Sequence, residues 1–339
     1  MHLPVYAHPT LTVLVDDSDS FLRSLSFQLD PMLANKTFHD TTTALHWLRQ
    51  SAQEAQEGGV PLHVNFDMQN LPADQCNVAL DLERIYRIAE QRQRFATPSV
   101  LVVDYSMPQM NGLEFCEAVA YLPCKKILFT GAADEKIAVS AFNRGLIDRY
   151  IKKSDDHALD MLEMEIAALQ RSYFDARSET LRELVLLHHY HFLDDPALAT
   201  LVTSLMASMG FVEHYIFPNP TGILFLDKHG KASLMMIETE QGMYAQYEIA
   251  RDSDAPPSLL DALLERRVLP FFTDPNGDGM YSSRVGDNWH RYSAAPRICQ
   301  GRETYYWALF ELPPHYFAQR PCGHAQFLLA QQELPNIAA

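Results

Sequence analysis

The sequence has little basic charge. Its 339 residues include 27 Lys and Arg against 43 Asp and Glu, which gives a formal net charge of −16 at pH 7. Neutralisation of phosphates by basic side chains supplies most of the non-specific affinity of proteins for nucleic acid. So acidic a chain is therefore a poor candidate for a general binder of DNA or RNA, although a local basic patch would still be able to bind nucleic acid.

Cysteine is also scarce, and its spacing shows no pattern. The five cysteines are Cys76, Cys116, Cys124, Cys299 and Cys322. An odd and scattered set argues against a disulfide framework and indicates a reducing, cytoplasmic environment. Because no Cys-x-x-Cys pairs occur, the sequence does not suggest a structural zinc site.

Long apolar runs and targeting signals are missing. No stretch is long and apolar enough to cross a bilayer, and the first ten residues, MHLPVYAHPT, lack the basic-then-apolar layout of a signal peptide. The second half has no helix-turn-helix signature, no Walker A loop, and neither the GGDEF nor the EAL sequence of cyclic-dinucleotide enzymes. We therefore expect no membrane association, and a second half whose activity comes from none of these motifs.

Strand and helix signals alternate in the first half. Apolar runs predict strands at residues 12–17, 36–40, 99–104, 125–130 and 148–153, and helical patterns follow them at 21–29, 43–50, 113–120, 137–142 and 159–173. Such alternation predicts a five-stranded parallel sheet with helices on both faces. Residues 51–97 exceed what one strand–helix unit needs. We interpret them as an insertion that ends in a charged helix at 77–94, and that serves either as a partner surface or as a solvated cover.

The pattern changes at about residue 177. Helical stretches at 181–190 and 197–209 are followed by strands at 221–227 and 231–240, which flank the turn Lys228-His229-Gly230. A third strand is expected at 243–252, a helix at 258–268 and a late strand at 302–312. Because the chain length suits two domains, we expect one over residues 1–176 and a second, α+β domain with a mainly antiparallel sheet over residues 177–339.

Chemically useful side chains follow the strands of the first half. In chain order they are Asp16 and Asp17, Asp104, Thr130, and Lys152 and Lys153. Because the carboxyl ends of parallel strands meet at one edge of the sheet, we expect these groups to converge. Three close carboxylates repel one another, and Mg²⁺ would remove the conflict. One carboxylate is then able to attack phosphorus while the hydroxyl and ammonium groups neutralise the transferring group, so the residue types predict aspartyl-phosphate chemistry.

Four stretches of this half resemble a known family. VLVDDSDSFLRS, LVVDYSMPQMNGLEF, ILFTG and DRYIKK are similar to the acidic pair, the phosphoacceptor loop, the switch threonine and the lysine strand of the receiver domains of two-component response regulators. The resemblance covers about residues 10–175 without the insertion. It implies a flavodoxin-like domain that a sensor histidine kinase or a phosphotransfer protein phosphorylates. It also implies that the only reactions catalysed are the domain's own phosphorylation and dephosphorylation.

The resemblance assigns roles to the acidic residues. Asp104 would be the phosphoacceptor and also a ligand of Mg²⁺. Asp17 would bind the metal directly, and Asp16 mainly through water. The backbone carbonyl of Ser106 would complete the protein ligands.

The resemblance also assigns the switch residues. Thr130 would hydrogen-bond the phosphoryl group, and Tyr150 would turn inward in response. Lys153 rather than Lys152 matches the family's lysine, because it stands three residues after Tyr150. Ser154 departs from the proline usual at that place. The family commonly dimerises on phosphorylation through the face that corresponds to residues 135–172, which implies a homodimer here.

Other functions remain open from the sequence. Phosphatases of the haloacid-dehalogenase type also have a nucleophilic aspartate at a strand end, but Ser106 stands where their second carboxylate belongs. A degenerate receiver would act as a constitutive module that binds a protein or a nucleotide. Transcription control by direct contact with DNA is a further alternative, which the acidic balance disfavours.

Three features of the second half are compatible with a ligand. DPNGDGM at 274–280 has the first half of a calcium loop, but Val285 stands where the bidentate glutamate belongs. HHYH at 188–191 has metal-binding residue types beside an apolar helix. A basic and aromatic region would suit a nucleotide or RNA phosphate; it contains Arg284, His290, Arg291, Tyr292, Arg297 and Arg302. A surface turn, helix packing and an ordinary strand surface are the simpler explanations.

The layout as a whole is similar to that of the response regulators of α-hydroxyketone quorum sensing. This resemblance rests on the long segment before Asp104 and on an output domain that is not a helix-turn-helix. It implies a role in quorum-sensing signal transduction downstream of sensor histidine kinases.

Overall fold

The chain folds into two compact units that are each made of several segments. The computed structural model describes residues 2–57, 62–65, 77–131, 135–187, 190–273 and 279–333, so the calcium-loop-like residues 274–278 and His188 and His189 lie outside the described part. The parallel-sheet unit comprises Pro9–Val60, Arg92–Arg177 and Phe327–Ala339. The antiparallel-sheet unit comprises Met1–His8, Pro61–Gln91 and Ser178–Gln326.

The parallel-sheet unit is built on five strands. In spatial order they are β3 (Asn35–Phe38), β2 (Leu11–Val15), β6 (Pro98–Val103), β7 (Lys125–Thr130) and β8 (Arg149–Lys152). All neighbouring strands run parallel. Counted within this unit the order is 2-1-3-4-5, which is that of flavodoxin-like doubly wound folds. The fold class expected from the alternating pattern is confirmed.

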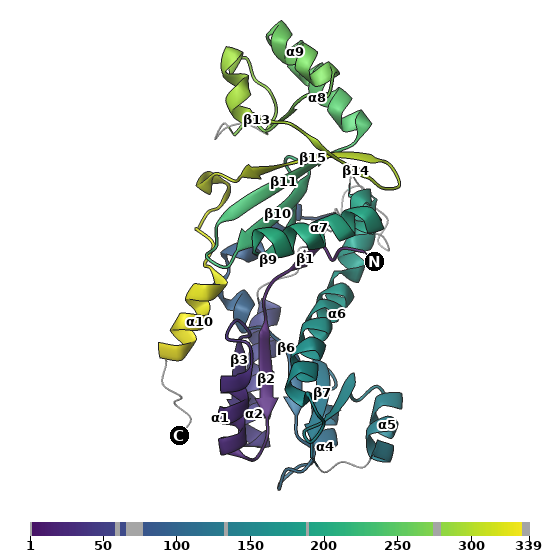
Figure 1. Cartoon of the computed structure of the whole chain (residues 1–339), viewed down its shortest axis with the longest axis vertical. Coiled ribbons are helices and arrows are strands. Elements are labelled where there is room, and N and C mark those ends of the chain that lie inside the picture. Colours follow the sequence, from purple (N-terminus) through teal and green to yellow (C-terminus); the bar gives the residue numbers. More distant parts are fainter. Residues whose placement is uncertain are drawn as a thin grey trace. The chain divides into compact units, whose positions relative to one another are not determined.

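Helices cover both faces of this sheet (Figure 1). On one face lie α1 (Asp19–Gln28) and α6 (Ala158–Leu186), and on the other lie α2 (Thr41–Glu57), α4 (Gly112–Ala118) and α5 (Glu135–Asn143). Side chains alternate between the two cores, since Leu14 of β2 packs in the core with Leu22 and Leu162 while its neighbours Val13 and Val15 pack in the other. Burial on both faces explains why the central strands β2, β6 and β7 read as apolar runs.

The antiparallel-sheet unit is built on six strands. In spatial order they are β1 (Tyr6–Ala7), β9 (Phe211–Phe217), β10 (Gly222–Asp227), β11 (Ala232–Glu238), β15 (Thr304–Glu311) and β14 (Arg297–Gln300). Every neighbouring pair is antiparallel. Helix α7 (Pro196–Met209), which follows the short 3-10 helix η3 (His191–Asp194), packs against β9 and β14. The expected α+β domain with a mainly antiparallel sheet is confirmed.

A small helical lobe belongs to the same unit. It contains α8 (Glu240–Asp252), α9 (Pro257–Leu264), the strand pair β12 (Leu269–Pro270) and β13 (Ser293–Ala294), and the 3-10 helix η4 (Gly286–Tyr292). Leu259, Phe272 and Trp289 are buried in its core. The 3-10 helix η5 (Pro314–Tyr316) and helix α10 (His324–Glu333) follow along the chain.

Residues 243–252, expected as a strand, belong to helix α8, so that prediction was wrong. The Thr239 side chain accepts a hydrogen bond from the Gly242 N–H at 3.2 Å and caps the helix. Met243, Gln246 and Ala250 are buried at the three- and four-residue spacing of a helix. The tyrosines and isoleucine favoured a strand by propensity, which packing overrides here.

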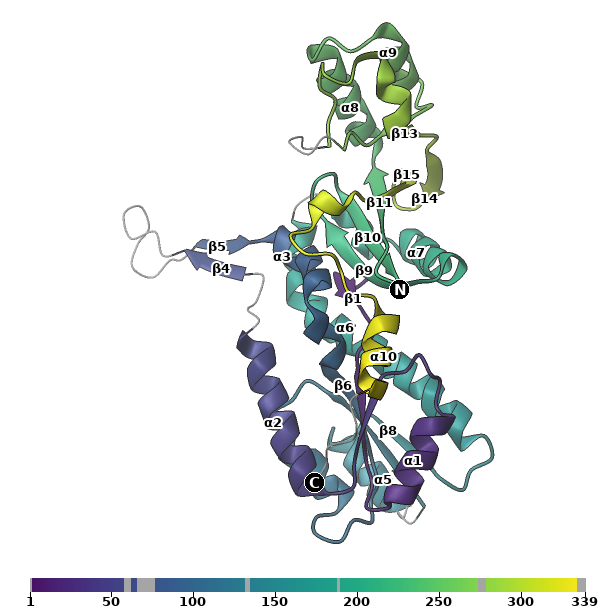
Figure 2. The same cartoon turned by 90° about the vertical axis from the view of Figure 1, so that its left-hand side faces the viewer.

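Two segments expected in the first domain belong instead to the antiparallel-sheet unit. Strand β1 pairs with β9, where Tyr6 faces Tyr215. Residues 61–91 supply the hairpin of β4 (Leu62–Asn65) and β5 (Asn77–Leu80), which stands apart from the six-stranded sheet (Figure 2), then α3 (Leu82–Tyr86) and the 3-10 helix η1 (Arg87–Glu90). The expected charged helix at 77–94 therefore starts only at residue 82, where the Asp81 side chain caps it.

Aromatic packing explains why the inserted segment joins this unit. The ring of Tyr86 lies against that of Phe217, with centroids 4.8 Å apart. Its hydroxyl donates to the backbone carbonyl of Tyr316. A second 3-10 helix, η2 (Arg92–Ala96), returns the chain to the parallel-sheet unit. The chain passes between the two units after residues 8, 60, 91, 177 and 326, so the domains are interleaved and not consecutive.

Asp195 holds α7 to the β14–β15 hairpin. Its buried carboxylate accepts hydrogen bonds from the N–H groups of Ala197 at 2.9 Å and Arg302 at 2.6 Å. A Cβ at Gly301 would lie 2.1 Å from this carboxylate, so any other residue there would displace the Asp195 side chain. Burial raises the pKa of Asp195, but these bonds and that from the Tyr305 hydroxyl lower it by more, so its pKa lies below the usual value of 3.8.

Replacing Asp195 by Ala is expected to lower the free energy of unfolding by about 3 kcal/mol, because a helix cap is lost and buried N–H groups lose their acceptor. Because the pKa is lowered on folding, this stabilisation is complete above pH 3.8 and disappears as the pH falls through the lower folded value. Urea unfolding at several pH values measures both effects. Asp252→Ala, at an exposed position, should change little, and an equal loss in both variants would contradict the assignment.

The described residues include no helix long and apolar enough to span a membrane.

Candidate functional site

The acidic residues predicted at strand ends lie together in the parallel-sheet unit. Asp16 follows β2 and Asp104 follows β6, and both side chains are buried, at 4% and 7% exposure. The backbone holds the two strand ends together, because the Asp104 N–H donates to the Val15 carbonyl at 2.9 Å. Two carboxylates in so little solvent require a cationic partner.

Lys153 supplies that positive charge. Its ammonium nitrogen lies 2.5 Å from Asp16 Oδ2 and 2.7 Å from Asp104 Oδ1, so one cation bridges both carboxylates. The backbone N–H of Lys153 donates to the Thr130 carbonyl at 3.0 Å, which fixes the residue beside the end of β7. Lys152, the other lysine of the pair, is the last residue of β8 and pairs with Thr130 in the sheet. The structure therefore brings Lys153 to both carboxylates.

The remaining carboxylate oxygens accept backbone hydrogen bonds. Asp16 Oδ1 accepts from the Ser18 N–H at 2.9 Å, and Asp104 Oδ2 from the Ser106 N–H at 2.7 Å. These bonds orient both side chains toward the lysine and satisfy buried charge. The loop after Asp104 closes tightly, because a Cβ at Gly112 would lie 2.2 Å from the Asp104 carbonyl oxygen. Asn111 then caps α4 through a capping box with Glu114.

Phe21 is a part of the site that the sequence did not reveal. The Lys153 ammonium lies 4.2 Å from the centroid of its ring. Cation–π attraction of this kind holds a lysine in place where part of its water shell is removed. The sequence showed Phe21 only as an apolar position of a helix. Its place in the first turn after the acidic pair is the signal that points to the site.

The other predicted residues occupy the same edge with different exposure. Thr130 is buried at the end of β7, and Tyr150 on β8 is half-buried against the core under α2, α4 and α5. Asp17 and Ser106 are exposed beside Asp16 and Asp104 respectively. The site thus combines a buried, lysine-bridged carboxylate pair with one carboxylate and one loop that face solvent.

The donor set suits a divalent cation. Asp16, Asp17 and Asp104 against Lys153 leave a formal charge of −2 if all are ionised. In the described part of the chain no three Asp, Glu, His or Cys side chains form a ready-made metal centre. Mg²⁺ commonly takes only one or two carboxylates and completes its shell with waters, carbonyl oxygens and phosphate oxygens. Hard oxygen donors with this excess of negative charge fit Mg²⁺.

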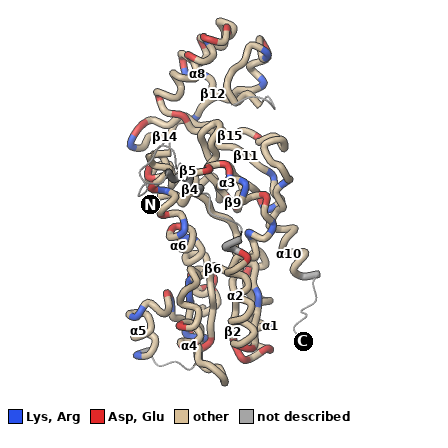
Figure 3. The backbone as a smooth tube through the Cα atoms, turned by 180° about the vertical axis from the view of Figure 1, so that it is seen from behind, with Lys and Arg blue, Asp and Glu red and all other residues tan. Residues whose placement is uncertain are grey.

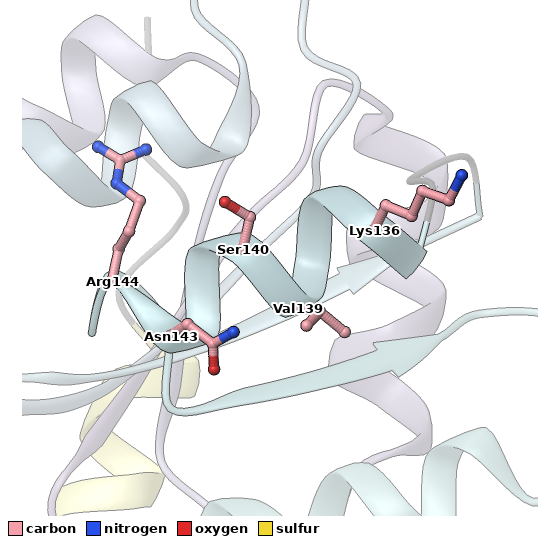
Figure 4. Close-up of a pocket in the computed structure, with 5 residues that line it drawn as sticks. All are labelled: Lys136, Val139, Ser140, Asn143 and Arg144. Carbon is pink, nitrogen blue, oxygen red and sulfur yellow. The ribbon is translucent and has the colours of Figure 1, made fainter.

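Among the residues of the second half that the structure describes, the ligand-like features do not form a comparable constellation. Arg297 stacks over the ring of Trp307 at 5.2 Å, and His290 stacks on Trp289 at 3.5 Å between centroids. A shallow pocket lies along one side of α5 (Figure 4). It is lined by Lys136, Val139, Ser140, Asn143 and Arg144.

A solved structure is similar to the chain over its whole length. It is that of the response regulator LqsR of Legionella pneumophila, which is 30% identical and aligns with a TM-score of 0.77 over 99% of this chain and 98% of LqsR. The chain belongs to the response regulators. No protein-family model matches the sequence.

A curated relative supports the same family over a shorter stretch. The transcriptional regulatory protein HptR of Staphylococcus aureus is 28% identical over 91 residues, which are 27% of this response regulator and 35% of HptR. The response regulator thus matches about a third of the length of that relative. Its parallel-sheet unit has the fold and the strand-end carboxylates expected of a receiver domain.

Proposed function

We propose that this response regulator is switched by phosphorylation of Asp104. The observation that carries the proposal is the Lys153 ammonium bridging Asp16 and Asp104 at the ends of β2 and β6. In the proposed reaction an oxygen of the Asp104 carboxylate bonds to phosphorus while the bond from phosphorus to the donor breaks. With a phosphohistidine donor, from a sensor histidine kinase or a phosphotransfer protein, the leaving imidazole takes up a proton.

The chain's own groups would stabilise the transferred phosphoryl group. The Lys153 ammonium already lies 2.7 Å from Asp104 Oδ1, so it is placed to neutralise an oxygen of the new group. Thr130, at the neighbouring strand end, would donate its hydroxyl to another. Mg²⁺, held by Asp16, Asp17, Asp104 and the Ser106 carbonyl, would shield the remaining negative charge. We propose no catalytic activity beyond phosphorylation and dephosphorylation of Asp104 itself.

The proposed reaction is tested by intact mass after incubation with acetyl phosphate. With Mg²⁺ we expect a single phosphoryl adduct, and with EDTA in its place we expect little or none, because the carboxylates would then repel the incoming dianion. Adding Mg²⁺ back should restore the adduct. No adduct under either condition would point to the degenerate receiver, which binds its targets without being phosphorylated.

We further propose that phosphorylation drives homodimerisation through α5, β8 and α6. New charge at Asp104 would draw in Thr130 and let Tyr150 turn inward, which changes this face. Large apolar side chains are exposed on it, namely Val139, Phe142, Met161 and Met164 at 59%, 54%, 40% and 67% exposure. Lys136 and Arg144 lie at the two ends of the α5 surface, and Val139 between them (Figure 4). Exposed apolar patches with a polar rim are typical of protein interfaces.

Phe142→Asp is expected to abolish this dimer, because it puts a charge into the apolar centre of the face. Light scattering should show the mass of the wild type doubling after phosphorylation and that of the variant unchanged. Phe27→Asp, which alters a side chain 91% exposed on α1, is the matched control and should still dimerise. Dimerisation of the Phe142 variant would assign the interface elsewhere.

The finer biological role is also a proposal. The resemblance of the layout to the response regulators of α-hydroxyketone quorum sensing supports a place in that signalling, downstream of sensor histidine kinases. The antiparallel-sheet unit would then act through a protein or a nucleotide. Direct contact with DNA is the weaker alternative because the chain is so acidic. A gel shift with steep salt dependence would favour that alternative.

A further inference from the structure

Strand β14 gives the six-stranded sheet an open edge. It pairs only with β15, from Arg297 opposite Trp307 to Gln300 opposite Thr304. In the described part of the chain no strand lies on its other side. Such an edge presents backbone N–H and C=O groups to any extended chain that approaches. The opposite edge, β1, has only two residues and offers far less.

The edge is held in shape from within the same unit. Its turn is fixed by the bond from the Arg302 N–H to the buried Asp195 carboxylate at 2.6 Å. Its first residue is fixed by the guanidinium of Arg297 over the ring of Trp307. Between them Ile298 is 58% exposed, which is unusual for a branched apolar side chain on a strand. A rigid, exposed edge needs little ordering when it binds.

Exposed arginines stand at both ends of this edge strand. Arg297 is the first residue of β14, and Arg302 stands in the turn after it, where Glu303 follows. Elsewhere in the unit acidic residues recur, as along α8 with Glu240, Glu248 and Asp252 (Figure 3). Both arginines are exposed, and Arg297 directly precedes Ile298 on the strand.

The positive charge of Arg297 and Arg302 distinguishes between the chains that could pair with the open edge of β14. Two copies of the chain that paired through β14 would bring Arg297 and Arg302 of both copies to the same short seam, and like charges opposite one another destabilise strand pairs. An acidic strand would be attracted by the same residues. The phosphate-binding alternative is less well supported, because Arg297 is stacked on Trp307 and lies along a strand.

We propose that β14 binds an extended acidic segment of a partner protein, which adds a seventh strand to the sheet. Backbone hydrogen bonds along Arg297–Gln300 would supply affinity. An apolar side chain of the segment would pack on Ile298, and its acidic residues would meet Arg297 and Arg302. This docking site goes beyond the phosphorylation switch and does not depend on it.

The probe for this site is an acetylated and amidated hexapeptide of alternating Glu and Val, labelled with fluorescein. Anisotropy with the full chain should show saturable binding, and replacing each Glu by Lys should weaken it by about tenfold or more. The double variant Arg297→Glu/Arg302→Glu should lose binding to a similar extent. Arg23→Glu/Arg320→Glu changes the net charge equally at exposed positions away from the edge and should bind as the wild type does.

Hydrogen exchange separates strand addition from simple charge attraction. The peptide should slow the exchange of amides within residues 297–300, and a proline at its centre should abolish binding because proline cannot pair. Equal binding by the proline peptide, or by the Arg297/Arg302 variant, would overturn the proposal. So would a short single-stranded RNA that binds in the peptide's place with the same dependence on both arginines. A mass by light scattering that doubles without phosphate and falls on Ile298→Asp would assign the edge to a second copy instead.

Discussion

Asp104→Asn is expected to abolish the phosphoryl adduct completely, even with excess acetyl phosphate and Mg²⁺. The amide keeps the shape of the side chain and still accepts the Ser106 N–H bond, but it is no nucleophile toward phosphorus. It also leaves one anionic carboxylate, Asp16, for Lys153. Intact mass spectrometry of the two proteins, treated side by side, measures the difference directly.

Two further variants make this result specific. Asp160→Asn removes an exposed carboxylate on α6 and should be phosphorylated like the wild type. Lys153→Met removes the bridging cation and should slow adduct formation by about a hundredfold or more, in line with the loss of one preorganised charge at a reacting group. An adduct that persists in Asp104→Asn would place the phosphoacceptor at another residue, and peptide mapping would then locate it.

Phe327→Ala is expected to destabilise the parallel-sheet unit by about 3 to 5 kcal/mol, the usual cost of deleting a buried phenyl ring. Phe327, on the chain's last helix α10, is 8% exposed and belongs to the core that covers one face of the sheet. Its ring lies 5.4 Å from that of Phe95, which is fully buried before β6. Truncation would leave a cavity beside Phe95 that rigid strands cannot close.

Hydrogen exchange of β2 and β6 amides during urea unfolding reports on this unit alone. Leu329→Ala on the same helix is the matched control, because that side chain is 61% exposed and should cost little. Unchanged protection of β6 in the Phe327 variant would mean that α10 is dispensable for the fold of the unit.

The sequence predicted the parallel-sheet unit well because its signals are local. The central strands β2, β6 and β7 are buried on both faces, as at β6, where all six residues are buried, so they read as apolar runs. The polar residues that end these runs, such as Asp16 and Asp104, converge through the geometry of parallel sheets alone. The role of Phe21 was not predicted, because an aromatic residue in a helical pattern does not indicate that its ring contacts a cation.

The remaining differences between the predicted and the observed fold come from contacts between residues that lie far apart in the sequence. Strand β1 has two residues and gains its place only from β9, more than 200 positions later, so no local pattern marks it. The same holds for Tyr86 against Phe217 and for Phe327 against Phe95. At α8 the strand propensity of Tyr247 and Ile249 led to the wrong prediction. The buried residues Met243 and Ala250 have the spacing of a helix.

The interleaving of the two units has a consequence for how such a regulator is inherited. In a protein whose modules follow one another, a single recombination event joins an old sensor-facing module to a new effector. Here the chain changes unit after residues 8, 60, 91, 177 and 326, so an exchange at any one of these points leaves fragments of both modules behind. We therefore expect descendants of this gene to keep both units together. A change of signalling partner is expected to occur by substitutions at exposed surfaces.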